Sequence, residues 1–152
     1  MTNEKTVKGG ARSSARLAAV QALYQIEASG SPSIVVTREF VEHRLGEIVD
    51  DEKYSKADAV FFTDLVIGVD KRVDEIDEKI KTNLSKKWKL DRIESVARAI
   101  LRAGSYEIIA RPDIPTSVII NEYVDVTKAF FEDSTPGFVN GVLDKIAKQT
   151  RE

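Results

Sequence analysis

The sequence predicts an all-α fold of two packed helical subdomains with about six to seven helices. Apolar residues recur at three- and four-residue steps through most of the chain, which is the spacing of amphipathic helices. No stretch alternates apolar and polar residues as a half-buried strand does. The 4 Pro and 8 Gly residues stand mostly between the periodic segments, as short loops between helices require.

The N-terminal part begins with residues 1–10, which predict a flexible arm. A helical pattern then runs from Ala11 to Ser29-Gly30, where these small residues end it. Ser31-Pro32 predicts an N-cap with Pro at the first helical position, followed by a weaker helix. Residues 34–37 (IVVT) have the composition of a strand, but we predict helix because the surrounding apolar spacing is helical.

The strongest periodic signal runs from Phe61 to Leu84 and predicts one long helix. Within it, Gly68 marks either a kink or a close contact with another helix. A further apolar stripe begins after Asp91, a candidate N-cap. It must end before Pro112, because Pro disfavours the helical conformation in the residue that precedes it.

The C-terminal part predicts two more helices, one at 118–131 and a last one that opens near Thr135-Pro136. All these elements together predict a single domain over residues 11–152. Its N-terminal helical half covers about residues 11–84 and its C-terminal half about residues 85–152.

The composition restricts the class of function. The chain has 0 Cys, no apolar run near the roughly 20 residues of a membrane span and no secretory pattern after Met1, so we expect a cytoplasmic protein. The single His, His43, lies in an acidic stretch and predicts a solvated surface residue. With no second His and no glycine-rich nucleotide loop, we expect no enzymatic activity, no metal site and no cofactor.

Carboxylates are numerous, but their spacing is typical of a solvated helix face with ion pairs between neighbouring turns. The acidic residues alternate with basic ones: Asp74, Glu75, Asp77 and Glu78 with Lys71, Arg72, Lys79 and Lys81. We therefore do not interpret them as a catalytic or metal-binding cluster.

The formal net charge of −2 argues against a general nucleic-acid binder, but the charge is unevenly distributed. The head of the chain up to Arg16 is basic and carries Lys5, Lys8, Arg12 and Arg16 against Glu4. Arg12 and Arg16 share a face at the N-terminus of the first predicted helix, where unpaired N–H groups and the helix dipole also favour a phosphate. Two interpretations remain open, a local phosphate site and a solvated tail. Likewise, Ser13 and Ser14 either cap the helix or bind phosphate oxygens.

A second unusual segment is residues 137–141 (GFVNG), where Gly and Asn occupy a predicted helix that they do not favour. The spacing alone favours close backbone packing at Gly141. The alternative is that Phe138 stacks on an RNA base while Asn140 bonds a base edge.

Both segments resemble the NusB family. Residues 15–24 (ARLAAVQALY) resemble its opening motif A-R-x-x-A-x-Q-A-L-Y, and residues 138–144 (FVNGVLD) match its signature residue for residue. Between them, I-L-R, Y-E, D-I-P and I-N-E landmarks follow in the family's order, at residues 100–102, 106–107, 113–115 and 120–122. The resemblance covers residues 11–148 and is weakest at 31–54.

The resemblance implies an all-helical antitermination factor of two packed helical subdomains that works without a cofactor. Such proteins pair with NusE, a small-subunit ribosomal protein, and bind single-stranded boxA RNA in ribosomal RNA leader transcripts. With NusA, NusG and RNA polymerase, the complex suppresses premature termination.

The resemblance also places RNA contacts on particular positions of this sequence. These are Arg12, Arg16, Gln21 and Tyr24 in the first helix, Phe138 and Asn140 in the last, and Asp133 in a nearby loop. To them the basic head adds Lys8 and Ser13. Family members often carry an unbroken arginine run where Ser13 and Ser14 stand, so the electrostatic part of the affinity is smaller unless Lys5 and Lys8 compensate. We expect both segments to form one groove for unpaired nucleotides.

Two other functions remain as alternatives. One is a NusB-like scaffold for protein interactions with little RNA binding of its own, which the interrupted arginine run favours. The other is the helical appendage of certain ribosomal RNA methyltransferases. We expect no methyltransferase domain here, because no glycine-rich cofactor loop follows the helices.

Overall fold

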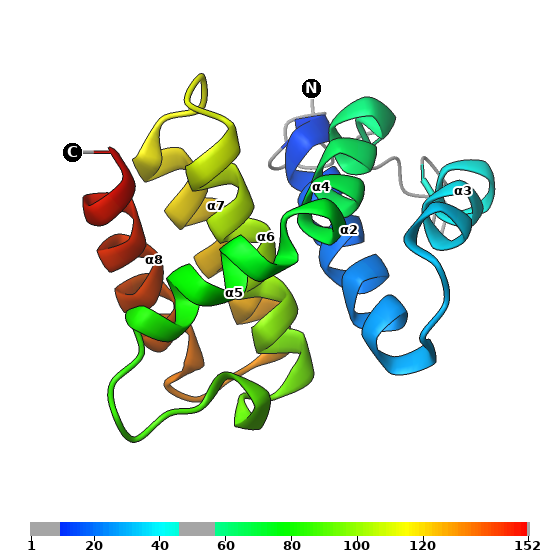
Figure 1. Cartoon of the computed structure of the whole chain (residues 1–152). Coiled ribbons are helices and arrows are strands. Elements are labelled where there is room, and N and C mark those ends of the chain that lie inside the picture. The colour runs from blue at the N-terminus through cyan, green and yellow to red at the C-terminus, as the bar shows by residue number, and fades with distance from the viewer. Residues whose placement is uncertain (1–9, 46–56, 152) are drawn as a thin grey trace. The chain divides into compact units, whose positions relative to one another are not determined.

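The computed structural model describes residues 10–45 and 57–151 (Figure 1). Within these ranges the chain forms seven α-helices and one short 3-10 helix, and no strand. The predicted all-α class is therefore confirmed. The predicted arm, except Gly10, lies outside the described residues.

The chain divides into two compact units, Met1–Ile67 and Gly68–Glu152. The first contains α2 (Gly10–Ser29), α3 (Ser33–His43) and the start of α4 (Ala59–Lys71). The division that the sequence predicts, near residue 84, stays a prediction. Within the second unit, α5 (Val73–Thr82) packs on α6 (Ser95–Ala110) and contacts α8 (Thr135–Arg151).

In the first unit, α2 ends as predicted at Ser29. Gly30 follows it with φ 75°, a left-handed conformation that glycine adopts without strain, and its N–H bonds the Ile26 carbonyl at 2.8 Å. The predicted start of the next helix is wrong by one residue. Pro32, not Ser31, is the N-cap of α3, because its ψ of 141° is extended and its carbonyl accepts the first helical N–H groups.

Residues 34–37, whose composition is strand-like, are helical in α3 as predicted. Phe40 of α3 stacks on Phe62 of α4 with ring centroids 5.5 Å apart. Both rings are buried together with other apolar residues of α2 and α4, among them Ala15, Ala19, Val20, Phe61 and Leu65. This apolar packing supplies the main stabilisation of the three helices.

The prediction of one long helix from Phe61 to Leu84 is wrong. The segment forms two helices, α4 and α5, separated at Arg72, whose φ of −114° and ψ of 22° leave the helical region. Lys71 closes α4, and Asp74 and Glu75 lie in the first turn of α5, so the charges complement the dipoles of a helix end and a new helix start. Arg72 Nε bonds Glu75 Oε1 at 3.0 Å across the break.

Of the two roles proposed for Gly68, the structure shows the close contact. A side chain at this position would overlap the ring of Tyr106 in α6. Tyr106 is buried, so the ring has little room to move away. Gly68 therefore lets the C-terminal end of α4, which belongs to the second unit, approach α6 more closely than any other residue would.

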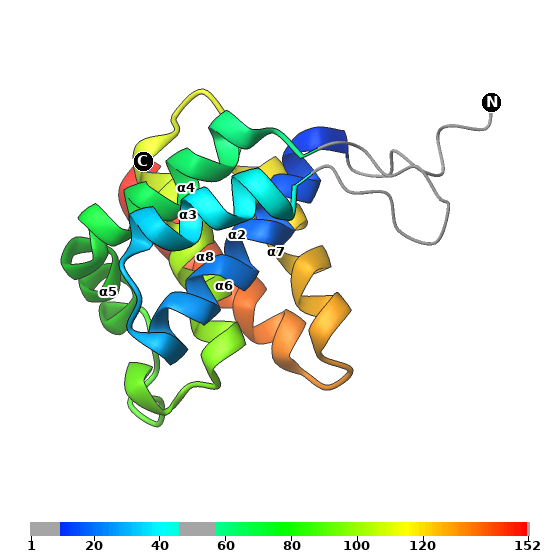
Figure 2. The same ribbon diagram turned by 90° about the vertical axis from the view of Figure 1, so that its right-hand side faces the viewer.

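The second unit is built around α6, which packs against α7 (Thr116–Phe130) and α8, as two views of the ribbon show (Figures 1 and 2). The predicted cap Asp91 is wrong. Asp91 lies in the 3-10 helix Leu90–Arg92, and Glu94 caps α6 instead, with its Oε1 accepting the N–H groups of Val96 and Ala97 at 2.8 and 3.3 Å. As predicted, α6 ends before Pro112.

Two polar contacts tie the helices of the second unit together. In the core, the Tyr123 hydroxyl of α7 donates to Glu107 Oε2 of α6 at 2.5 Å, and both residues are buried. Nearer the surface, Arg102 of α6 forms a bidentate pair with Asp77 of α5, at 2.8 and 2.9 Å. The interpretation of Asp77 as part of a solvated face is therefore wrong, since its side chain is only 19% exposed.

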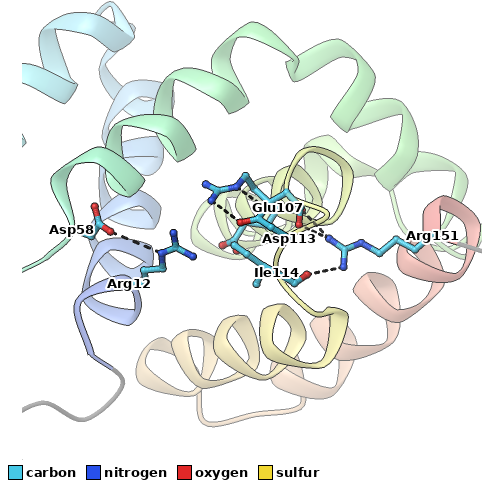
Figure 3. A network of polar contacts seen from close by, with 7 residues as sticks. Arg12, Asp58, Glu107, Asp113, Ile114 and Arg151 are labelled. Carbon is cyan, nitrogen blue, oxygen red and sulfur yellow. Dashed lines mark hydrogen bonds and ion pairs between the residues drawn. The ribbon is translucent and has the colours of Figure 1, made fainter.

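Arg151, near the end of α8, completes the C-terminus of α6 (Figure 3). Its guanidinium donates to the carbonyls of Glu107, Ile108, Arg111 and Ile114, at 2.8 to 3.3 Å, and to Thr116 Oγ1 at 3.1 Å. The Ile108 carbonyl faces Pro112 four residues later, which has no N–H to offer. We call this set of hydrogen bonds the Arg151 cap.

Candidate nucleic-acid interface

Arg12 lies at the N-terminal end of α2 with an exposed guanidinium (Figure 3). Its Nε is 3.9 Å from Asp58 Oδ2, and its Cζ is 4.6 Å from the centre of the Phe61 ring. Two hydrogen bonds fix the position of Asp58. Its Oδ1 accepts the Phe61 N–H, and its own N–H donates to the Ala11 carbonyl. An exposed ion pair this long contributes little, so a phosphate can replace Asp58 at small cost.

Arg16, one turn later, is buried and only 3% exposed. Its Cζ lies 5.0 Å from the centre of the same Phe61 ring. The two arginines that the sequence places on one face therefore differ in accessibility. An RNA contact of Arg16 stays a prediction, and it requires the guanidinium to become accessible.

Ser13 and Ser14 are not helix caps, because α2 already begins at Gly10 and both residues lie inside the helix. The Ser14 hydroxyl donates to the Gly10 carbonyl at 3.3 Å, a bond to the preceding turn. Ser13 is half-buried. The phosphate contact predicted for Ser13 stays a prediction.

The other predicted residues of α2 lie on its exposed side. Gln21 is exposed, and 43% of Tyr24 is accessible, one turn further along the helix. Tyr24 thus presents an aromatic face to solvent, as stacking on a base requires. Lys8 and Lys5 lie outside the described residues.

In the second unit, Asp133 lies in the connection before α8 and is exposed. Its Oδ1 accepts the hydroxyl of Thr135 at 2.6 Å and the N–H of Thr135 at 2.9 Å. These two hydrogen bonds lower the pKa of the Asp133 carboxyl below its usual value. Asp133 therefore orders the first turn of α8, whether or not it also contacts a ligand.

Phe138 and Asn140 lie in the first two turns of α8. Asn140 is exposed, and Phe138 is half-buried with its ring 5.2 Å from that of Trp88. The favoured interpretation of Gly141, close backbone packing, is wrong, because a Cβ built there meets nothing within 4 Å. The same holds for Gly137, so neither glycine is required by the packing of α8.

Sequence reasoning missed Trp88 and the lysines around it. The signal was present as Lys86-Lys87-Trp88-Lys89, a basic run interrupted by an aromatic residue. The predicted residues of α2 belong to the first unit, and Asp133, Phe138 and Asn140 to the second. Their convergence into one groove stays a prediction.

Comparison with known proteins gives the family. A model of the NusB family matches residues 13–148. The chain belongs to the NusB family. A transcription antitermination protein NusB of Sphingopyxis alaskensis is 50% identical over 141 residues, which covers 93% of this chain and 95% of the relative. The NusB of Caulobacter vibrioides is also 50% identical, with the same coverage of both chains. These relatives are named as transcription antitermination proteins, so the family is non-enzymatic.

Solved structures of the NusB family share the fold. Thermotoga maritima NusB has a TM-score of 0.75 and 31% sequence identity, with 93% of each chain covered. A structure of the antitermination factors NusB and NusE in complex with double-stranded RNA has a TM-score of 0.75 and 26% identity, covering 98% of this chain and 99% of that one. This complex shows that a protein of this fold is compatible with RNA and a protein partner at once.

The described residues form neither a metal cluster nor a membrane-spanning helix. Over residues 10–45 and 57–151, no group of three or more His, Cys, Asp or Glu side chains is placed to hold a metal ion. In the same ranges, no helix has the length and apolar character to cross a membrane. His43 is exposed, with 70% of its side chain accessible, as predicted for a solvated residue.

Proposed function

We propose that this chain is a cytoplasmic RNA-binding antitermination factor that binds boxA RNA of ribosomal RNA transcripts together with NusE. In this role it supports processive transcription by RNA polymerase in a complex that includes NusA and NusG. The observation that carries the proposal is family membership over residues 13–148, which include all predicted RNA contacts except Lys8 and Arg12.

The surface chemistry supports RNA as the ligand. Arg12 offers an exposed charge for a phosphate, Tyr24 an exposed ring for a base, and Asn140 an exposed amide for a base edge. Unpaired RNA is recognised by this combination of stacking, edge hydrogen bonds and backbone charge. The solved complex of a NusB with NusE and RNA has the same fold, which supports a shared interface with a second protein.

Few of the predicted RNA contacts are accessible cations, which predicts weak binding by the chain alone. With Arg16 buried, Arg12 is the one predicted arginine contact that is exposed in the described residues. Each phosphate neutralised contributes about 0.7 to the slope of affinity against salt for a single strand. We therefore expect a shallow salt slope for the chain alone, and a higher affinity when NusE adds its own surface.

Fluorescence anisotropy with labelled single-stranded boxA RNA tests the proposal, at two salt concentrations, with this chain, NusE and their mixture. We expect the mixture to bind more tightly than either protein. Arg12→Ala is expected to weaken binding and flatten the salt dependence, whereas His43→Ala, which changes another exposed residue, leaves both unchanged. If NusE does not raise the affinity for boxA RNA, the proposal is contradicted.

The burial of Arg16 also favours a second candidate, a NusB-like scaffold that binds NusE but little RNA. In that case the mixture binds boxA RNA no better than NusE alone, while calorimetry still detects the protein pair. The two functions are thus separated by the same set of samples.

A further inference from the structure

Trp88 is the single Trp of the chain and lies in the connection between α5 and α6. Half of its side chain, 50%, is exposed, which is unusual for the largest apolar ring in a protein. Its ring centre lies 5.2 Å from that of Phe138, with the planes tilted by 42°. One side of the indole is thus supported by α8 while much of the rest remains accessible.

Positively charged residues flank Trp88 in the sequence. Lys86, Lys87 and Lys89 are adjacent to Trp88 in sequence and all three are exposed. In the part of the chain that the structure describes, no ion pair is recorded for them. Lysines next to an accessible aromatic ring are the usual elements of a surface that follows a nucleic-acid backbone and stacks its bases.

The neighbouring face of α8 is open. Gly137, Asn140 and Gly141 are exposed. Asn140 and Gly141 follow Gly137 by three and four residues, so they share one side of the helix with it. A Cβ at either glycine would meet nothing within 4 Å. Because Gly lowers helix stability and no packing here needs it, the bare backbone is better explained by a ligand that approaches this face.

We propose that Trp88 stacks on an unpaired RNA base, with Phe138 as its support and Lys86, Lys87 and Lys89 as contacts to the adjoining phosphates. The inference rests on the proposed RNA-binding function and extends that site from α8 to the connection between α5 and α6. An acidic peptide would also attract the lysines, but it would not need the aromatic face or the amide of Asn140.

Intrinsic fluorescence gives a direct test, since Trp88 is the only indole in the chain. Single-stranded boxA RNA is added to the chain alone at low salt, and we expect the emission of Trp88 to be quenched as the base stacks. The matched experiment adds a polyglutamate peptide of equal charge. Quenching by the peptide to the same extent would overturn the proposal.

Affinity measurements separate stacking from packing. Trp88→Leu keeps an apolar contact with Phe138 but removes the aromatic face, and we expect boxA RNA binding in the presence of NusE to fall about 5- to 150-fold. Trp88→Phe keeps an aromatic ring, so its affinity for boxA RNA should fall about threefold or less. Val118→Ala, which trims another exposed apolar residue of the second unit, should change nothing.

The outcomes distinguish this inference from the function on which it rests. If the unmodified chain with NusE does not bind boxA RNA, both are wrong. If it binds, but the emission of Trp88 is unchanged and Trp88→Leu binds equally well, the function stands and the stacking proposal is wrong. Circular dichroism shows whether each variant is folded. If Trp88→Leu unfolds, the quenching of the unmodified chain and the affinity of Trp88→Phe still test whether Trp88 stacks on a base.

Discussion

Replacing Arg151 by Ala removes the whole Arg151 cap and tests how the end of α6 is stabilised. The carbonyls of Ile108 and Ile114 accept no recorded backbone N–H, so the guanidinium is their partner in the described chain. Leaving a partly buried acceptor without a partner costs about 1–2 kcal/mol. Two such carbonyls predict a loss of about 2–4 kcal/mol in the free energy of unfolding.

The loss is measured by urea unfolding and by thermal melts followed by circular dichroism. For a chain of this size about 1 kcal/mol shifts Tm by roughly 2–4 °C, so we expect a decrease of about 4–16 °C. The stability of Arg151→Lys should lie between those of the unmodified chain and Arg151→Ala, because one ammonium cannot reach all the carbonyls. Lys148→Ala on the same helix removes only an exposed pair with Asp144 and should change stability by about 0.5 kcal/mol or less.

Equal stability of Arg151→Ala and Lys148→Ala would contradict this prediction. Water would then satisfy the carbonyls at the end of α6 as well as the guanidinium does, and the contacts of Arg151 would contribute nothing net. Amide hydrogen exchange gives an independent check, since loss of the cap should raise exchange rates first in the last turn of α6.

Two further predictions concern α8 and its first turn. Gly141→Ala should raise the free energy of unfolding by about 0.5–1 kcal/mol, because the new methyl group meets open space. Gly104→Ala should lower it, because the new Cβ would lie 2.9 Å from Leu143. Thermal melts of the two variants check these opposite signs. The lowered pKa of Asp133 means that its hydrogen bonds to Thr135 stabilise the fold above the ordinary carboxyl pKa and are lost as the pH falls through the folded value. Asp133→Asn should therefore remove part of the loss of stability below about pH 4, seen in urea midpoints measured from pH 2 to 7, and an unchanged acid limb would contradict this.

The positions of the helices were predictable because each of them buries one apolar side, and that spacing is visible in the sequence. The break at Arg72 was missed because the apolar stripe continues through both α4 and α5. Only the charges mark it, with Lys71 before the break and Asp74 after it. Caps were the least predictable feature, since neighbouring polar residues compete for the same N–H groups, as Asp91 and Glu94 do.

The candidate interface was predictable where accessibility follows from the helix itself, as for Tyr24 and Asn140. It was not predictable where a contact with a residue distant in the sequence determines the position and exposure of a side chain. Arg16 is buried over Phe61 of another helix, and Trp88 meets Phe138 across the second unit. Such contacts depend on how the helices pack, which the spacing of apolar residues along the sequence does not specify.

The hydrogen bond between Tyr123 and Glu107 has a consequence for how α7 is oriented. A helix with a broad apolar side can rotate about its axis, or slide by a turn, and still bury hydrocarbon against α6. Only one of these arrangements brings the phenol to the carboxylate, and in every other one the buried carboxylate loses this hydrogen bond. The pair therefore selects a single native arrangement among near-equivalent ones, so Tyr123→Phe should yield a looser, more heterogeneous interior rather than a merely weaker one.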